Sequence, residues 1–211
     1  MNKSSTQQIK TKSISTAIRV SGKSAKPVNS LVRFGSAILS HSLPPILLGA
    51  IVNPIGSLPD GDIIFTLQPA WEAILKIAKT NPEILFNLSS RQWEQVVAAC
   101  YDKAGFDEVI LTPRSGDKGR DVIAVKNGMW SVRIIDQVKA YKPNHLVKAD
   151  EVRALMGVLL GESNASKGVV TTTSDFAPRL KEDPLISPFL PHRLQLVNYS
   201  DLIERFNILS S

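Results

Sequence analysis

The strongest constraint on this chain is the regular alternation of helical and extended patterns that begins at Ser89. Apolar residues recur first at helical spacing and then at strand spacing, and the two periodicities alternate towards the C-terminus. Helices mixed with strands in this way predict an α/β fold with a mixed central sheet flanked by helices. The predicted order is α-β-β-β-α-β-α-β-α, over residues 89–105, 107–111, 120–125, 130–140, 149–160, 168–173, a short helix from about 176, 194–198 and 200–206.

Short local signals mark the ends of several of these elements. Ser89 and Ser90 are typical helix caps at the start of the first helix, and Ser200 is expected to cap the last one. Asn127-Gly128 is typical of a tight hairpin turn, so it is expected to join the second strand to the third.

The residues before this region differ in composition and predict two further segments. Residues 1–42 have the pattern of a flexible arm, and residues 43–84 that of a connector rich in Pro and Gly, which ends in one amphipathic helix over 70–79. Residues 85–211 then form the main domain. Every charged residue before Asp60 is basic, which makes attraction of the arm to nucleic acid a hypothesis, with a solubilising tail or a transit-like leader as the alternatives.

Composition also excludes several classes of protein. The apolar run from Ile46 to Val52 is too short to cross a membrane, which needs about 20 apolar residues, so no membrane partner is expected. The single cysteine, Cys100, excludes an internal disulfide framework and a cysteine-rich zinc site, and its helical pattern predicts a buried, inert thiol. A cytoplasmic protein is the natural inference.

Three residues on two neighbouring strands form a pattern that suits metal binding and catalysis. Strand alternation places Gln137 and Lys139 on one face, about 7 Å apart at roughly 3.3 Å per residue, and hairpin pairing brings Asp121 beside them. A divalent metal ion for phosphodiester hydrolysis can be held by the oxygens of Asp121 and Gln137 and the carbonyl of Val138. Lys139 can then orient or deprotonate a water. Spacing alone, however, favours the alternative of a surface Asp and a solvated Lys.

The residues around this pattern carry a resemblance to a known family. Six ordered segments over about 120 residues resemble the catalytic domain of the Mrr family of restriction endonucleases, within the PD-(D/E)xK nuclease superfamily. They are residues 90–97 (SRQWEQVV), 105–110 (GFDEVI), 115–124 (SGDKGRDVIA), 137–139 (QVK), 152–157 (VRALMG) and 168–176 (GVVTTTSDF).

The resemblance implies a restriction-endonuclease-like core and a role for each site residue. It implies that Asp121 is the metal-binding carboxylate, that Gln137 takes the place of a second acidic ligand, and that Lys139 is the catalytic lysine, with Mg²⁺ or Mn²⁺ as the cofactor. Glu94 would be a helix-borne acid that reaches the same site, and an exposed helix glutamate is the alternative. Asp117 is interpreted as a loop cap, with an auxiliary metal ligand as the alternative.

One residue departs from the family pattern. Asp136 stands before Gln137 where the family usually has an apolar residue, and strand alternation points it to the opposite face. That face is therefore expected to be exposed to solvent or covered by a partner.

The resulting functional hypothesis is a divalent-metal-dependent DNA endonuclease that restricts foreign or modified DNA. Loop cations beside the site suit phosphate binding and are expected to contact DNA: Arg114, Lys118, Arg120 and Lys142. A homodimer is a further hypothesis, because double-strand cleavage usually needs two active sites. The alternatives are a catalytically silent DNA-binding module on the same fold and an assembly subunit that covers the Asp136 face.

Overall fold

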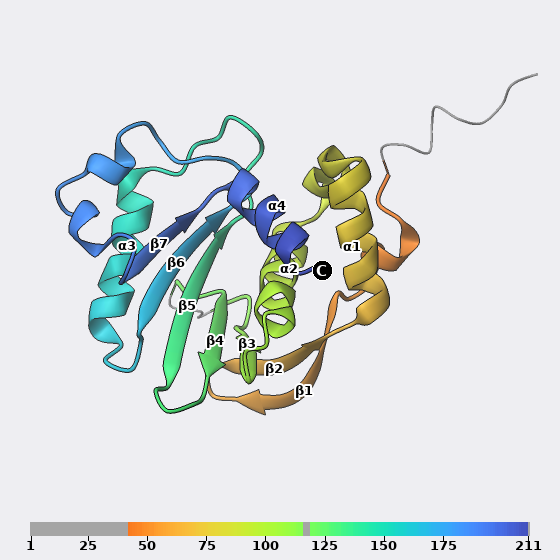
Figure 1. The fold of residues 1–211 in the computed structure, drawn as a ribbon, viewed down its shortest axis with the longest axis horizontal. Coiled ribbons are helices and arrows are strands. Elements are labelled where there is room, and N and C mark those ends of the chain that lie inside the picture. The colour runs from red at the N-terminus through yellow and green to blue at the C-terminus, as the bar shows by residue number, and fades with distance from the viewer. Residues whose placement is uncertain (1–41, 116–118, 211) are drawn as a thin grey trace, which may run out of the picture. The chain divides into compact units, whose positions relative to one another are not determined.

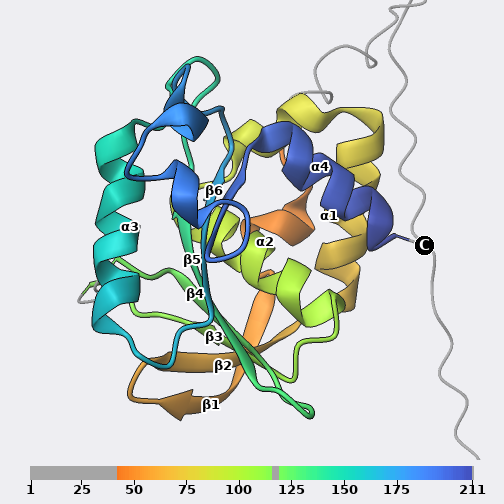
Figure 2. The same cartoon turned by 60° about the vertical axis from the view of Figure 1, so that its left-hand side comes forward.

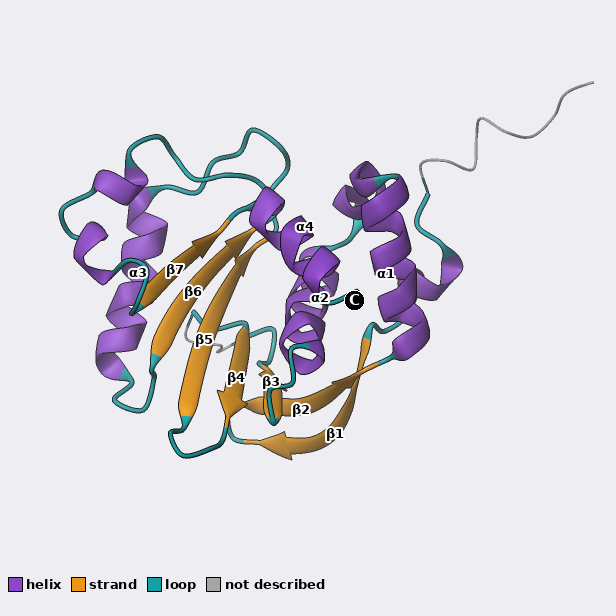
Figure 3. Ribbon diagram, in the orientation of Figure 1, coloured by secondary structure: helices purple, strands orange, loops and turns teal. Residues whose placement is uncertain are grey.

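A seven-stranded mixed sheet runs through the residues that the computed structural model describes, 42–115 and 119–210 (Figures 1 and 3). The strands lie in sequence order across the sheet: β1 (Val52–Leu58), β2 (Gly61–Thr66), β3 (Glu108–Leu111), β4 (Val122–Lys126), β5 (Val132–Lys139), β6 (Lys167–Thr172) and β7 (Leu194–Val197). Neighbours from β1 to β5 are antiparallel, whereas β5, β6 and β7 are parallel. The predicted mixed sheet flanked by helices is confirmed.

Helices cover the two faces of this sheet. The helix α3 (Ala149–Gly161) lies on one face, and α1 (Gln68–Thr80), α2 (Ser90–Lys103) and α4 (Tyr199–Ile208) lie on the other (Figures 1 and 2). Each face has its own apolar core, and Trp93 of α2 belongs to one core. Because the strands β4 and β5 are covered on both sides, polar groups on them need a partner or a function.

Two of the predicted local signals are confirmed. Ser89 caps α2 in a reciprocal capping box: the N–H of Gln92 donates to Ser89 Oγ at 3.3 Å, and the N–H of Ser89 donates to Gln92 Oε1 at 2.9 Å. Cys100 on α2 is buried, and this burial raises the pKa of its thiol to about 12, against a lowering by Arg205. The thiol is therefore protonated at neutral pH.

Two other predictions of local structure were wrong. Asn198, not Ser200, caps α4, because its side chain accepts the N–H of Asp201 at 3.0 Å. The short helix expected from about residue 176 is absent from this part of the described chain, which forms the 3₁₀ turns Leu180–Glu182 and Ser187–Phe189 instead. Prolines remove the backbone donors that an α-helix needs there: Pro178, Pro184, Pro188 and Pro191.

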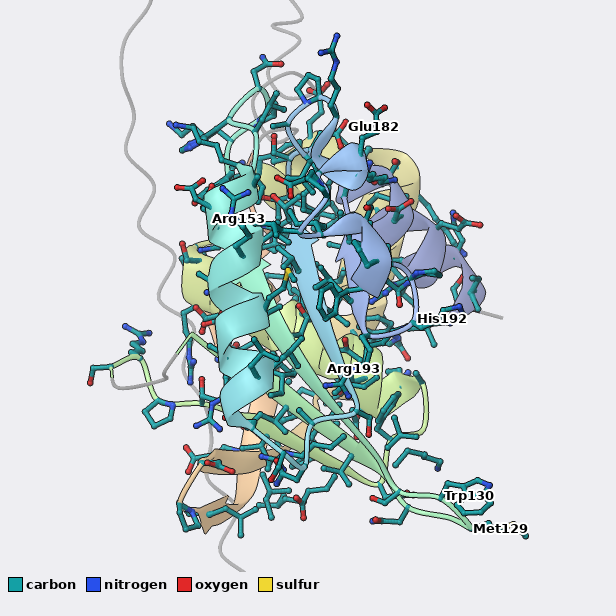
Figure 4. The ribbon with its side chains drawn as sticks, turned by 90° about the vertical axis from the view of Figure 1, so that its left-hand side faces the viewer. Met129, Trp130, Arg153, Glu182, His192 and Arg193 are labelled. Carbon is teal, nitrogen blue, oxygen red and sulfur yellow. The ribbon has the colours of Figure 1, made fainter. Side chains whose placement is uncertain are left out.

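The turn between β4 and β5 is longer than the two-residue hairpin predicted at Asn127-Gly128. Lys126 pairs with Val132, so residues 127–131 form the loop. The N–H of Asn127 donates to Asp107 Oδ2 at 2.6 Å, which holds it away from the strand ladder. At the tip, Met129 and Trp130 are exposed and point away from the sheet (Figure 4).

The hairpin of β1 and β2 was not predicted, because Pro54, Gly56 and Gly61 suggested an irregular connector. β1 is the edge strand, where proline costs no ladder hydrogen bond, and its register shifts between Pro54 and Gly56. Gly61 has φ 147°, and a Cβ there would lie 2.5 Å from the carbonyl oxygen of Leu111, so only glycine fits. Residues 52–66 thus extend the sheet, while the division of the chain at residues 42 and 84 stays a prediction.

The helix predicted over residues 70–79 is present as α1. The arm predicted at the N-terminus lies, apart from residue 42, outside the described residues. Over the part of the chain that is described, none of the helices has the length and apolar character needed to span a membrane.

Candidate active site

Asp121 lies where β4 begins, beside the last residues of β5. The ladder of the two strands ends at the pair Val122 and Asp136. The N–H of Asp121 donates to the carbonyl of Asp136 at 3.0 Å, so Asp121 and Val122 both lie beside Asp136 and the register shifts by one residue there. The structure therefore places Asp121 beside the end of β5, outside the regular ladder.

A second contact fixes the carboxylate of Asp121. Its Oδ2 accepts the N–H of Val138 at 2.6 Å. In an extended strand the N–H and C=O of one residue point to the same edge, so the carbonyl of Val138 also faces the Asp121 side. The end of β5 thus presents a backbone N–H and a backbone carbonyl towards this carboxylate.

The amide oxygen of Gln137 is the most informative atom of the site. Gln137 Oε1 is buried and has no hydrogen-bond partner among the described residues. A buried, unpaired acceptor costs about 1–3 kcal/mol, so such an atom needs an explanation. A hard divalent cation, which prefers oxygen ligands, fits an unpaired amide oxygen one residue before Val138, whose N–H donates to a carboxylate.

Lys139 is held at both ends. Its carbonyl accepts the Oγ1–H of Thr172 at 2.9 Å and the N–H of Thr173 at 3.2 Å. Its Nζ lies 3.6 Å from Oε1 of Glu151 on α3. The lysine that shares a strand face with Gln137 is therefore ordered at its backbone by β6 and at its ammonium group by α3.

Glu94 reaches the same region from the other face of the sheet. Glu94 and Asp121 line one pocket of about 350 Å³, together with Arg114 and residues of the α2 start. Glu94 Oε2 is paired with Arg91 Nη1 at 2.6 Å, and the same nitrogen donates to the carbonyl of Thr112 at 2.8 Å. Among the described residues no group of three or more His, Cys, Asp or Glu side chains is placed to hold a metal ion.

The expectation for Asp136 was wrong. Asp136 is fully buried, and its Oδ2 accepts hydrogen bonds from Tyr101 of α2 at 2.8 Å and from Thr171 of β6 at 2.9 Å. Burial raises the pKa of its carboxyl to about 7, against a lowering by Arg205 of α4. The face is thus covered by helices of this same chain, which removes the observation that suggested an assembly subunit.

The four cations predicted to contact DNA have different surroundings. Arg114 and Lys142 are exposed, and Arg114 lines the pocket of Asp121. Arg120 is only 6% exposed and forms ion pairs with Glu162 and, at 3.3 Å, with Asp60. The structure therefore contradicts a surface role for Arg120, because its guanidinium joins the turn between β1 and β2 to the residue that follows α3.

Two predicted residues of the preceding loop, Asp117 and Lys118, lie outside the described residues. Sequence reasoning missed two neighbours of Lys139: Glu151, which pairs with it, and Tyr141, whose hydroxyl donates to Glu151. Because Tyr141 lies two residues after Lys139, strand alternation would have placed the two side chains on the same face. Glu151 is an acid in the first turn of a helix, a position that favours a negative charge.

The comparison with known families assigns this chain to a class of protein. Residues 85–205 match the family model Mrr_cat, described as restriction endonuclease. This match covers more than half of the chain, so the chain belongs to the Mrr_cat restriction endonuclease family.

Two solved structures are similar in fold. One is the "DNA modification-dependent restriction endonuclease AspBHI", with a TM-score of 0.48 and 19% identity over 70% of this chain and 37% of that one. The other is "MspJI Restriction Endonuclease in Complex with 27-mer Oligonucleotide", with a TM-score of 0.40 and 19% identity over 65% and 30% of the two chains. The chain thus spans about a third of the length of these proteins. No curated protein gives a sequence match to it.

Proposed function

We propose that this chain is a divalent-metal-dependent DNA endonuclease whose active site comprises Asp121, Gln137, Lys139 and Glu94. The observation that carries the proposal is the buried, unpaired Oε1 of Gln137 on β5, next to Val138, whose N–H donates to the carboxylate of Asp121. A cation held by these oxygens would satisfy that atom, which otherwise lowers the stability of the fold.

The ligands of the cation, Mg²⁺ or Mn²⁺, would be Asp121, Gln137, the carbonyl of Val138 and Glu94. When bound, such a cation polarises the scissile phosphate and lowers the pKa of a nucleophilic water. Gln137 contributes no charge, so Asp121 alone would leave the site with one negative ligand. Glu94 supplies the second carboxylate if the ion pair with Arg91 opens, and this explains why both acids line one pocket.

Lys139 would act on the substrate rather than on the cation. Its ammonium group lies on the Gln137 face of β5 and carries the positive charge that offsets the charge developing on the phosphate. Arg114 and Lys142, both exposed beside the site, would hold neighbouring phosphates of the backbone without reading sequence.

The biological role would be restriction of foreign or modified DNA, and the acting form would be a homodimer. Cutting both strands of a duplex at one position requires two such sites, which a symmetric dimer provides. Cleavage of methylated and unmethylated duplexes of the same sequence would show whether modification of the DNA matters.

A second candidate is a catalytically silent DNA-binding module. It is favoured by the neutral Gln137 and by the absence of a three-residue cluster of His, Cys, Asp or Glu in the described ranges. Such a module binds DNA without cleaving it, and Mg²⁺ does not raise its melting temperature.

The experiment that separates the two is cleavage of a supercoiled plasmid with Mg²⁺, with Mn²⁺ and with EDTA, for the wild type and Glu94→Gln. The proposal expects nicked or linear product only with metal, and at least a tenfold slower reaction in the variant. Binding of DNA without any product in either metal would contradict the nuclease proposal.

A further inference from the structure

The first turn of α3 contacts the end of β5 through a single carboxylate. Glu151 Oε1 lies 3.6 Å from Nζ of Lys139, and the side chains of both residues are 21% exposed. We infer that Glu151 is a positioning residue, which holds the ammonium group of Lys139 where the scissile phosphate binds. The inference rests on the proposed nuclease function, and the tests below separate the two.

Both oxygens of the Glu151 carboxylate are fixed by neighbours. Oε2 accepts the N–H of Lys148 at 3.0 Å, and Oε1 accepts the hydroxyl of Tyr141. Burial raises the pKa of Glu151, but the hydrogen bonds from Lys148 and Tyr141 and the charge of Lys139 together lower it. The helix N-terminus also favours a negative charge. Glu151 is therefore an ionised and rigid anchor.

The backbone of Lys139 is equally constrained, by Thr172 at the end of β6 and by Thr173 directly after it. A lysine side chain between these two anchors has lost much of its rotamer freedom, which costs up to about 2 kcal/mol. A partly exposed ion pair stabilises the folded protein by only about 0–1 kcal/mol. The contact with Glu151 therefore contributes little net stability, and its consequence is a defined position for the ammonium group.

Glu151→Gln separates the ion pair from the structural contacts of the same side chain. A glutamine still accepts the N–H of Lys148 through its amide oxygen, as in a capping box, and its NH2 group donates to the hydroxyl oxygen of Tyr141, but it loses the charge that attracts Lys139. Asp150→Asn is the matched control, because it removes a negative charge from the same helical turn and Asp150 is exposed.

With Mg²⁺ and duplex DNA, Glu151→Gln is expected to lower kcat by 10- to 100-fold, since a misplacement of about 1 Å costs up to 10²-fold. KM for DNA, the half-saturating Mg²⁺ concentration and the melting temperature should stay close to the wild-type values, and Asp150→Asn should keep its kcat. The inference is overturned by an unchanged kcat in Glu151→Gln or by an equal loss of kcat in Asp150→Asn. It is also overturned by a shift in the Mg²⁺ requirement, which would make Glu151 a metal ligand.

A second measurement does not depend on activity. In NMR spectra of protein labelled at the lysine ε-carbons, the Lys139 ε-protons should be inequivalent in the wild type and averaged in Glu151→Gln, with Lys139→Arg to assign the signal. If the wild type does not cleave DNA, the proposed function fails, and these spectra still decide the placement of Lys139. Identical Lys139 signals in the two proteins would contradict it.

Discussion

Asp121 accepts the backbone N–H of Val138 at 2.6 Å, and this bond ties the start of β4 to the segment of β5 that carries Gln137 and Lys139. The carboxylate is therefore oriented by the sheet itself. Preorganised ligands and charges act without reorganisation during the reaction, which is the general basis of electrostatic catalysis. The predictions below test the parts of this arrangement one at a time.

The unpaired oxygen of Gln137 predicts opposite effects on stability with and without metal. Gln137→Met removes a buried acceptor that has no partner among the described residues, so the metal-free protein should gain about 1 kcal/mol. The same variant should lose the increase in melting temperature that Mg²⁺ gives the wild type. Gln137→Glu is the reverse test: its added charge should lower the half-saturating Mg²⁺ concentration about tenfold, or 1.4 kcal/mol. A Mg²⁺ response that is the same in all three proteins would rule out Gln137 as a ligand.

Arg114 and Lys142 are expected to contact phosphates. Each alanine variant should weaken DNA binding about equally for all sequences and reduce the slope of log K against log salt by about 1. Fluorescence anisotropy at several salt concentrations measures this slope, and Lys76→Ala, an exposed cation on α1, is the control. Slopes identical to the wild-type value would show that neither residue contacts a DNA phosphate.

Arg120 is expected to matter for folding and not for DNA. Its side chain is 7% exposed and pairs with Glu162 and Asp60, so Arg120→Met takes this cation from Glu162 and leaves Asp60 with Arg133 alone. We expect a loss of about 2 kcal/mol in the free energy of unfolding by urea, below the 3–5 kcal/mol of fully buried pairs because the partners are partly exposed. DNA affinity well below the melting temperature should be unchanged. Weaker DNA binding by an Arg120→Met variant that is as stable as the wild type would show that Arg120 contacts DNA.

Cys100 gives a simple test of the packing between α2 and the sheet. It is the only cysteine of the chain, and burial raises the pKa of its thiol to about 12, so the thiolate is scarce at pH 8. Ellman's reagent should therefore react with the native protein at least a hundredfold more slowly than with the protein in guanidinium chloride. Equal rates would show that the core around α2 opens readily.

The sequence predicted most of the core elements because their local signals agree with the final packing. Alternation identified β4 and β5, and the pairing of these strands places Asp121 beside the end of β5. The β1–β2 hairpin was missed because Pro54 and Gly61, which usually interrupt strands, are tolerated here by an edge position and by a close approach to Leu111. Such tolerance depends on neighbours that are distant in sequence.

The chemistry of the site was less predictable than its geometry. A pattern of alternating residues showed that Asp136 faces away from Gln137, but not that α2 and α4 bury it. In the same way, a basic loop residue was expected at the DNA surface, yet Arg120 turns inwards to two carboxylates that lie 60 and 42 residues away in the chain. Long-range ion pairs leave no periodic signal in a sequence.

The most direct test of the account is cleavage of duplex DNA by Asp121→Asn in the presence of Mg²⁺. Asparagine has nearly the shape of aspartate and keeps an oxygen for the N–H of Val138, so the variant should fold with a metal-free melting temperature close to that of the wild type. The account predicts that the wild type cuts DNA, that EDTA stops it, and that Asp121→Asn binds DNA but shows at least a hundredfold lower cleavage rate. Cleavage by Asp121→Asn at the wild-type rate would contradict the assignment of this site.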